Sequence, residues 1–249
     1  RWRDAENSVA YALGEMVPGR SLLDVGCGPG SITVDLARRV APGRVTAVDA
    51  SAEAVELARA TAREAGVEGI EFLVADVHDL DLPEGSFDVV HAHQVLQHVA
   101  DPVRALERMR RMVAPGGVVA VCDSDYSGMH WYPPLPELEE WMRLYQRIAR
   151  RNGGEPDAGR HMLAWARQAG FEDVTYVAEV WNHSDPDRRA WWGGMWADRI
   201  LESDMGRQAV EEGEATREDL ERISAGWKAW SRDRDGVFVV PRGAILCRV

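Results

Sequence analysis

The chain has 249 residues, of which 45% are hydrophobic, and this is enough apolar material for one sizeable core. Asp and Glu outnumber Lys and Arg by 41 to 29, which gives a formal net charge of -12. A chain this acidic repels phosphate backbones and anionic membrane surfaces, so nucleic-acid and membrane partners are not expected.

The three cysteines are Cys27, Cys122 and Cys247. They are scattered and odd in number, unlike a disulfide framework or a set of zinc ligands, so a reducing cytoplasm is expected. No apolar run approaches the roughly 18 residues of a membrane span. No signal segment opens the sequence, which begins at Arg1 rather than Met and so leaves open what preceded it.

Short apolar runs alternate with amphipathic stretches between residues 21 and 126, a rhythm typical of a parallel α/β sheet. Several runs are apolar at successive residues, as expected of strands covered by helices on both faces. Strands are predicted at residues 21–25, 45–49, 70–75, 87–92 and 117–122, with helices at 31–39, 52–65 and 103–113.

The second half is less regular. Helical periodicity predicts helices at 136–151 and 159–169, and an apolar run predicts a strand at 174–180. Residues 237–240 and 244–249 predict one interrupted final strand or a bent pair. The stretch 185–235 is a charged, helix-prone insertion that contains Trp191, Trp192, Trp196, Trp227 and Trp230.

The first predicted strand runs directly into a glycine-rich turn. Asp24 is followed by glycines at alternate positions, Gly26, Gly28 and Gly30. The missing Cβ atoms let the backbone turn sharply and let a ligand approach the main chain and the N-terminus of the next helix.

Acidic residues also mark the ends of the next two strands. Asp49 can accept hydrogen bonds from both hydroxyls of a ribose. Asp76 can take the exocyclic amine of adenine, beside an apolar wall from Val77. Three successive strand ends therefore predict a polar ring at the carboxyl edge of the sheet, where open α/β folds bind ligands.

Four segments, taken in order, resemble a known family: "LLDVGCGPG", "VTAVDAS", "FLVADVHDLDLPEGSFDVVHAHQVLQHV" and "PGG". They are similar to motifs of class I S-adenosylmethionine-dependent methyltransferases, in particular the ubiquinone/menaquinone-biosynthesis (methyltransferase type 11) group. The resemblance covers residues 1–126. It implies an α/β fold, a Rossmann-like, doubly wound, mostly parallel seven-stranded sheet with a helical insertion near the C-terminus.

The resemblance also implies a cofactor, S-adenosyl-L-methionine, and a product, S-adenosyl-L-homocysteine. It places the methionine portion at Asp24 and the three glycines, and the end of the fourth strand, 92–94, beside the sulfonium and the acceptor. The full set of implied cofactor contacts is Asp24, Gly26, Gly28, Gly30, Asp49, Ala50, Asp76, Val77 and His93.

A sulfonium methyl is already activated, so the protein needs mainly to hold a nucleophile in line and exclude water. An acceptor that is a hydroxyl or a carbon acid is helped by a base, for which His93 and His98 are the candidates. The alternative is that His98 only hydrogen-bonds a carbonyl or packs at a turn. His91 and His93 alternate along a strand, but without a third ligand no metal is expected.

Two groups of side chains are candidates for the acceptor site. Gln94, Gln97 and His98 share one face if the segment after the fourth strand is helical. Aromatic side chains can form a lid over a planar or apolar acceptor, or a small core that holds the inserted helices. The aromatic candidates are Tyr126, Trp131, Trp191 and Trp192.

The sequence is thus expected to form a single methyltransferase domain, 1–249, with a cofactor-binding half, 1–126, and helical insertions at 127–158 and 185–235 forming an acceptor lid. The predicted reaction is methyl transfer to oxygen, nitrogen or carbon of a small molecule. One alternative is an NAD-type Rossmann oxidoreductase, although that fingerprint has two residues before its last glycine. Another is a non-catalytic S-adenosylmethionine-binding module. The aromatic insertion also suggests a homodimer interface.

Overall fold

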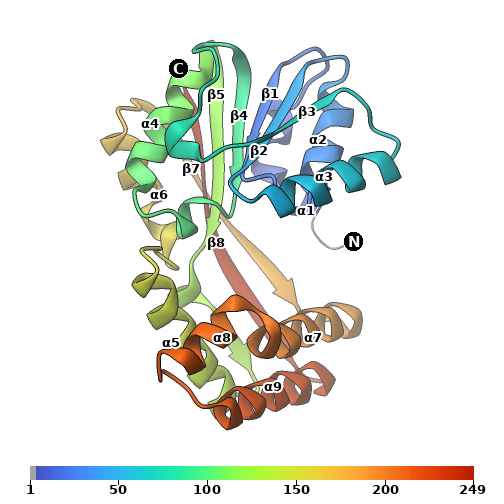
Figure 1. Cartoon of the computed structure of the whole chain (residues 1–249), viewed down its shortest axis with the longest axis vertical. Helices are drawn as coiled ribbons and strands as arrows, with labels where there is room; N and C mark the ends of the chain where they lie inside the picture. Colours follow the sequence, from blue (N-terminus) through green and yellow to red (C-terminus); the bar gives the residue numbers. More distant parts are fainter. Residues whose placement is uncertain (1–3) are drawn as a thin grey trace. The chain divides into compact units, whose positions relative to one another are not determined.

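The computed structural model describes residues 4–249 (Figure 1). The chain divides into two compact units. Unit 1 comprises Arg1–Ser124, Ala158–Glu179 and Arg242–Val249, and unit 2 comprises Asp125–Asp157 and Val180–Pro241. Apart from residue 158, both predicted insertions fall in unit 2.

Unit 1 is built on the predicted parallel sheet. Its strands follow the order β3-β2-β1-β4-β5-β8, and β7 also pairs with β8. Neighbours among the first five strands are parallel, whereas β8 is antiparallel to β5. The strands are β1 (Leu22–Val25), β2 (Val45–Asp49), β3 (Ile70–Val74), β4 (Phe87–His93), β5 (Val113–Ser124), β7 (Asp173–His183) and β8 (Val237–Arg248). The end of β7, from residue 180, and the start of β8, up to residue 241, belong to unit 2. The predicted Rossmann-like α/β fold is confirmed.

Two helices of unit 1, α3 and α4, begin where capping residues predict. The Ser51 hydroxyl accepts the N–H of Ala54, and the Asp101 carboxylate accepts the N–H of Arg104 just before a helix with proline in its first turn. The elements are α1 (Ala5–Ser8), η1 (Ala10–Glu15), α2 (Ser31–Val40), α3 (Ala52–Glu64), η2 (Val77–Asp79), η3 (Leu96–His98), α4 (Pro102–Met112) and α6 (Ala158–Gln168).

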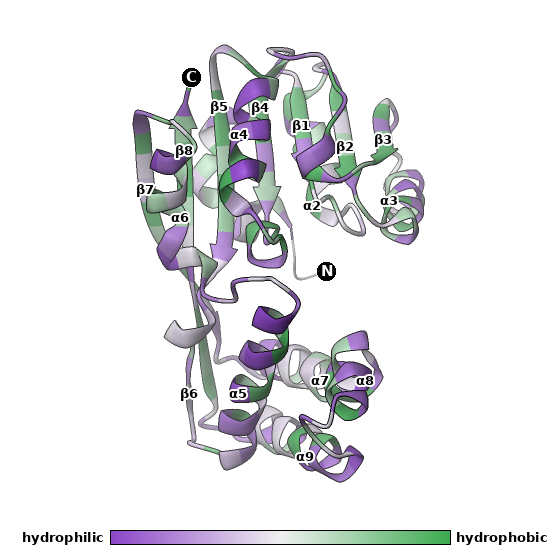
Figure 2. Ribbon diagram, turned by 60° about the vertical axis from the view of Figure 1, so that its left-hand side comes forward, coloured by the Kyte–Doolittle hydropathy of each residue, from purple (hydrophilic) through white to green (hydrophobic). Residues whose placement is uncertain are grey.

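Both faces of this sheet are buried, which explains the apolar residues at successive positions in β1 and β4. Leu23 and Val90 belong to one core cluster, with residues of α4 and α6, whereas Leu22 and Val89 belong to another, with residues of α2. In Figure 2 these strands are largely hydrophobic in colour, while helices such as α4 carry hydrophilic outer residues.

Unit 2 is mainly helical. Its elements are η4 (Tyr126–Gly128), β6 (His130–Tyr132), α5 (Pro136–Arg151), α7 (Pro186–Glu202), α8 (Asp204–Glu211) and α9 (Arg217–Arg232). β6 is an eighth strand that the sequence did not predict, and it pairs with the first residues of β8. Three residues are too few to show a strand pattern.

The core of unit 2 is aromatic. Trp141, Trp196, Trp227 and Trp230 are 1% exposed or less. The Trp141 ring meets the Trp227 ring edge-on, with centroids 4.9 Å apart and an interplanar angle of 85°. Edge-to-face contacts of this kind are favoured by the ring quadrupoles. Most of the tryptophans therefore pack the helices of this unit together.

The prediction of an interrupted final strand is wrong, because β8 is continuous from Val237 to Arg248. Val239 pairs with His130 of β6, whereas Arg242 pairs with Ser124 of β5. Pro241 lies between these two ladders, where its missing N–H costs no strand hydrogen bond. Pro241, which suggests an interrupted strand in the sequence, therefore lies where β8 changes its neighbouring strand from β6 to β5.

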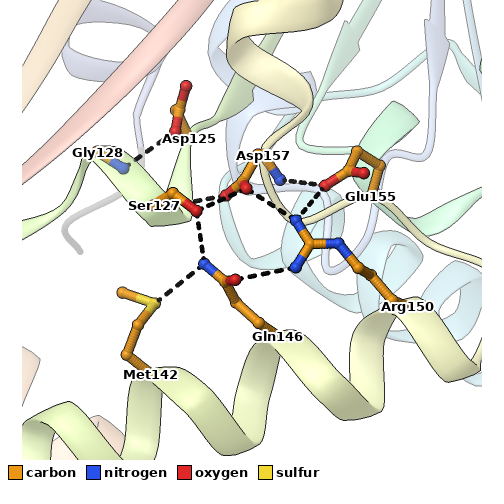
Figure 3. A network of polar contacts seen from close by, with 8 residues as sticks. All are labelled: Asp125, Ser127, Gly128, Met142, Gln146, Arg150, Glu155 and Asp157. Carbon is orange, nitrogen blue, oxygen red and sulfur yellow. Dashed lines mark hydrogen bonds and ion pairs between the residues drawn. The ribbon is translucent and has the colours of Figure 1, made fainter.

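A polar network fixes the irregular segments of unit 2 (Figure 3). The Asp157 carboxylate accepts the Ser127 N–H at 2.7 Å, the Ser127 hydroxyl at 2.6 Å and the Arg150 guanidinium at 2.8 Å. Burial opposes ionisation, but these bonds hold the pKa of Asp157 below its usual value. Gln146 on α5 donates to the same Ser127 hydroxyl, so the loop after β5 is tied to that helix.

Candidate cofactor site

The glycine turn after β1 contains three left-handed residues, Gly26, Gly28 and Gly30, with φ of 68°, 53° and 77°. A Cβ on Gly26 would lie 2.3 Å from Cγ2 of Val95, and one on Gly30 would lie 2.9 Å from the Cα of Ala58. A Cβ on Gly28 would have no described atom within 4 Å. Packing therefore requires two of the glycines, and only Gly28 faces open space that a ligand can occupy.

Asp49, at the end of β2, is positioned against this turn. Its Oδ2 accepts the N–H of Gly28 at 2.9 Å, and its Oδ1 accepts the N–H of Ser51 at 2.9 Å. The residue is partly exposed, and the neighbouring Ala50 is exposed. Each carboxylate oxygen retains a lone pair for a further donor, so Asp49 fits the predicted contact with ribose hydroxyls.

Asp76 follows β3 and is exposed. The N–H of His78, followed by its ring Nδ1, donates to the carboxylate, and these bonds lower the pKa of Asp76 despite some desolvation. The group is therefore an ionised acceptor near neutral pH, as contact with an adenine amine requires. Val77 is 6% exposed and packs in the core of unit 1.

Asp24 is enclosed rather than open to a ligand. It is 3% exposed, its Oδ1 lies 2.7 Å from Nδ1 of His91, and its Oδ2 accepts the Thr33 hydroxyl at 2.6 Å. Thr33 and His91 were not among the predicted site residues. The parallel register, in which Asp24 faces His91, is the feature that brings the ring to the carboxylate.

The end of β4 carries a backbone conformation that the sequence did not indicate. Gln94 has φ of 57°, the left-handed region that non-glycine residues seldom adopt, and such conformations concentrate at functional sites. Its N–H donates to the carbonyl of Cys122 at 2.8 Å, and its side-chain amide donates to the Ser124 hydroxyl at 2.7 Å. His93, just before it, is 8% exposed.

The assumption that Gln94, Gln97 and His98 share a helical face is wrong. Left-handed Gln94 ends the strand, and the helical turn covers only Leu96–His98. Gln97 is buried, whereas His98 is exposed and its Nε2 accepts the Gln97 amide at 3.0 Å. The two residues therefore lie in different environments.

Asp123 fixes this turn from the adjacent strand. Its carboxylate is 0% exposed and accepts the N–H groups of Leu96 and Gln97 at 3.3 and 3.1 Å. Burial raises the pKa of Asp123 to about 7, although the two backbone bonds favour the carboxylate. In the sequence, Asp123 is recognisable only as an acidic residue that directly follows the apolar run of β5.

The aromatic candidates for the acceptor site all lie in unit 2 and contact other rings. Tyr126 stacks on Tyr145 with centroids 4.1 Å apart, and Trp131 stacks on Phe238 at 5.5 Å. Trp192 is buried, whereas Trp191 is 38% exposed. Packing thus explains three of these four rings, and Trp191 is the most accessible of them.

Within residues 4–249, no group of three His, Cys, Asp or Glu side chains is arranged to hold a metal ion. Nor does any helix in that range have the length and apolar character needed to cross a bilayer.

Comparisons with known proteins identify the family of the chain. The profile of a methyltransferase domain family matches residues 17–184. An uncharacterized methyltransferase of Schizosaccharomyces pombe is 31% identical over 98% of this chain and 90% of its own length. A demethylmenaquinone methyltransferase of Lactococcus lactis is 34% identical over 64% of this chain and 68% of its own length.

A structure of phosphoethanolamine N-methyltransferase 2 from Haemonchus contortus with S-adenosyl-L-methionine has a similar fold. The match has a TM-score of 0.58, 20% identity, and covers 95% of this chain and 50% of that one. This likeness shows that the two chains share an α/β fold.

The chain belongs to the methyltransferase domain family. It is an S-adenosylmethionine-dependent methyltransferase, as predicted. The alternative of an NAD-type oxidoreductase is not favoured.

Proposed function

We propose that unit 1 holds S-adenosylmethionine along the carboxyl ends of β1 to β4. In this arrangement Asp49 binds the ribose, Asp76 and Val77 bind the adenine, and Gly28 lies against the methionine portion. The observation that carries the proposal is the open side of Gly28 together with the bond from its N–H to Asp49. A ligand fits against backbone there without meeting a side chain.

The cofactor supplies an activated methyl group, so the protein must orient the acceptor and exclude water. The end of β4 is suited to orientation because Gln94 is tied to β5 through both its backbone and its side chain. Asp123 holds the following turn in place through two backbone N–H groups. These bonds preorganise the residues from His93 to His98.

The chemical role of the two histidines stays a prediction. A base is needed only where the acceptor loses a proton, as a hydroxyl or a carbon acid does. His98 is exposed and reachable by an acceptor, whereas His93 is buried at the end of β4. The acceptor is proposed to be small and partly apolar, and to take the methyl group on oxygen, nitrogen or carbon.

The other expectations also remain proposals. Residues 127–158 and 185–235 are proposed to cover the acceptor, with Tyr126, Trp131, Trp191 and Trp192 among the contacts. A cytoplasmic location is consistent with three free, buried cysteines. A homodimer, and the absence of a nucleic-acid partner, rest on the aromatic insertion and the acidic charge.

The site assignment is tested by Asp49→Ala. Losing the ribose acceptor is expected to weaken binding of S-adenosylhomocysteine by at least about tenfold, because hydrogen bonds to a charged group are worth about 1.5–3 kcal/mol. Isothermal titration calorimetry gives the dissociation constant. Glu64→Ala, which removes an exposed carboxylate at the end of α3, is the control. Equal affinities for Asp49→Ala and the unmodified chain would overturn the assignment.

A further inference from the structure

A hydrogen bond to the Asp24 carboxylate connects the two ends of the glycine turn. Asp24 lies in β1, two residues before Gly26, while its partner Thr33 lies three residues beyond Gly30. Thr33 is 0% exposed, and its hydroxyl donates to Oδ2 at 2.6 Å. One carboxylate thus links the strand that enters the turn to the helix that leaves it.

This link joins a helix that begins without a side-chain cap. α2 begins after Gly30, which adopts the left-handed conformation and makes no side-chain capping bond. Helix N-termini are favoured by a nearby negative charge, because their first N–H groups are unpaired within the helix. Asp24 contacts this first turn through the hydroxyl of Thr33.

The second oxygen of Asp24 is held by His91 on β4. The Nδ1–H group donates to Oδ1 at 2.7 Å, and the ring is 0% exposed. The bond fixes the ring orientation and, in the neutral ring, the tautomer. Both carboxylate oxygens therefore have partners within unit 1, and the group is 3% exposed.

We propose that Asp24 positions the cofactor turn and does not itself bind the cofactor. In this inference, which rests on the proposed cofactor site, Thr33, Asp24 and His91 form one buried unit that sets the spacing of β1, α2 and β4 around Gly28. The role differs from the one that the family resemblance implies for Asp24, which is a direct contact with the methionine portion. It also gives Thr33 and His91 a function as positioning residues.

The two roles predict opposite results for Thr33→Val, which removes the hydroxyl and keeps the shape. If Asp24 binds the cofactor directly, freeing Oδ2 leaves affinity unchanged or increases it. If Asp24 positions the turn, affinity for S-adenosylhomocysteine falls about tenfold, the loss expected from a hydrogen bond to a charged group. Thr33→Ser restores the hydroxyl and is expected to restore the affinity.

Thr46→Val is the matched control. Thr46 is also 0% exposed and its hydroxyl also donates to a carboxylate, that of Glu71 at 3.1 Å, but it lies in β2 away from the turn. We expect this variant to lose stability without losing affinity. A role of Thr33 in stability alone would make the two valine variants alike, and this outcome overturns the proposal.

A second pair of variants covers the case in which Thr33→Val does not fold. His91→Asn keeps an N–H donor for Asp24 and is expected to bind S-adenosylhomocysteine better than His91→Leu, which has none. Equal affinity in this pair also overturns the proposal. The unmodified chain and Asp49→Ala are titrated in the same experiment, because failure of the unmodified chain to bind, or unchanged binding by Asp49→Ala, counts against the cofactor site itself.

Discussion

The two units bury different kinds of side chains. Unit 1 has buried polar groups near the carboxyl ends of its strands, such as Asp24, His91 and Asp123, each with hydrogen-bond partners from another element. Unit 2 has an aromatic core around Trp141 and Trp227. A parallel sheet brings strand ends to one edge, so polar residues far apart in sequence converge there. Helices that lack such an edge are held together by packing.

The largest expected effect is on the aromatic core. Trp227→Ala removes a side chain that is 0% exposed and contacts the rings of Trp141 and Phe238. Truncation of a buried tryptophan costs about 3–5 kcal/mol, because it loses burial and leaves a cavity. Urea denaturation followed by circular dichroism measures the loss.

Trp191→Ala is the control, because this ring is 38% exposed. We expect it to change the unfolding free energy much less than Trp227→Ala. If both variants lose the same stability, the tryptophans of unit 2 do not divide into core and surface as the structure places them.

The next effect is the pH dependence of the unfolding free energy, which has opposite signs for a buried residue of each unit. Burial raises the pKa of Asp123 in unit 1 to about 7. Between its usual value and pH 7 the folded state therefore holds a proton that the unfolded state has lost, so stability falls as pH rises. The change is on the order of 1.4 kcal/mol for each pH unit across that range.

His183 in unit 2 behaves in the opposite way. Burial, assisted by the nearby Arg188, lowers the pKa of His183 to about 4. The unfolded state then binds a proton below pH 6.5 that the folded state does not, so this residue makes stability fall as pH falls toward 4.

Asp123→Asn separates the two effects. Unfolding free energies at pH 5, 6 and 7 are expected to show the variant gaining on the unmodified chain as pH rises, because the amide cannot ionise. A constant difference across these pH values would mean that Asp123 is already ionised at pH 5 in the folded chain.

The sequence predicts a feature well where the residues that determine it are close together in the chain, and poorly where they are far apart. Strand β2 and helix α5 have their predicted bounds, because the periodicity of apolar residues is a local pattern. The enclosure of Asp24 depends on His91, 67 residues away, and on strand register, so no local pattern indicates it. The left-handed conformation of Gln94 could not be predicted either, because the sequence normally indicates this conformation by a glycine. Tryptophans at helical spacing fit a lid and a core equally well.

The smallest effect separates the two kinds of glycine in the turn of unit 1. Gly28→Ala is expected to cost about 1–2 kcal/mol in unfolding free energy, the strain of an L-residue in the left-handed region. Gly26→Ala has the same strain and in addition meets Cγ2 of Val95, so it should cost more. Val95→Ala removes that methyl group. In a double-mutant cycle of unfolding free energies, Gly26→Ala is therefore expected to cost less in the Val95→Ala background than in the unmodified chain.

Cofactor affinity gives the complementary measurement. Gly28→Ala places a methyl group in the open space where the ligand is proposed to lie. The variant should therefore lose more binding free energy for S-adenosylhomocysteine than it loses in unfolding free energy. Gly26→Ala in the Val95→Ala background should bind more tightly than Gly28→Ala, because its added methyl group occupies the volume that Val95 vacates. The reverse order of affinities would place the ligand on the Val95 side of the turn, and the polar edge of unit 1 would then have to be assigned differently.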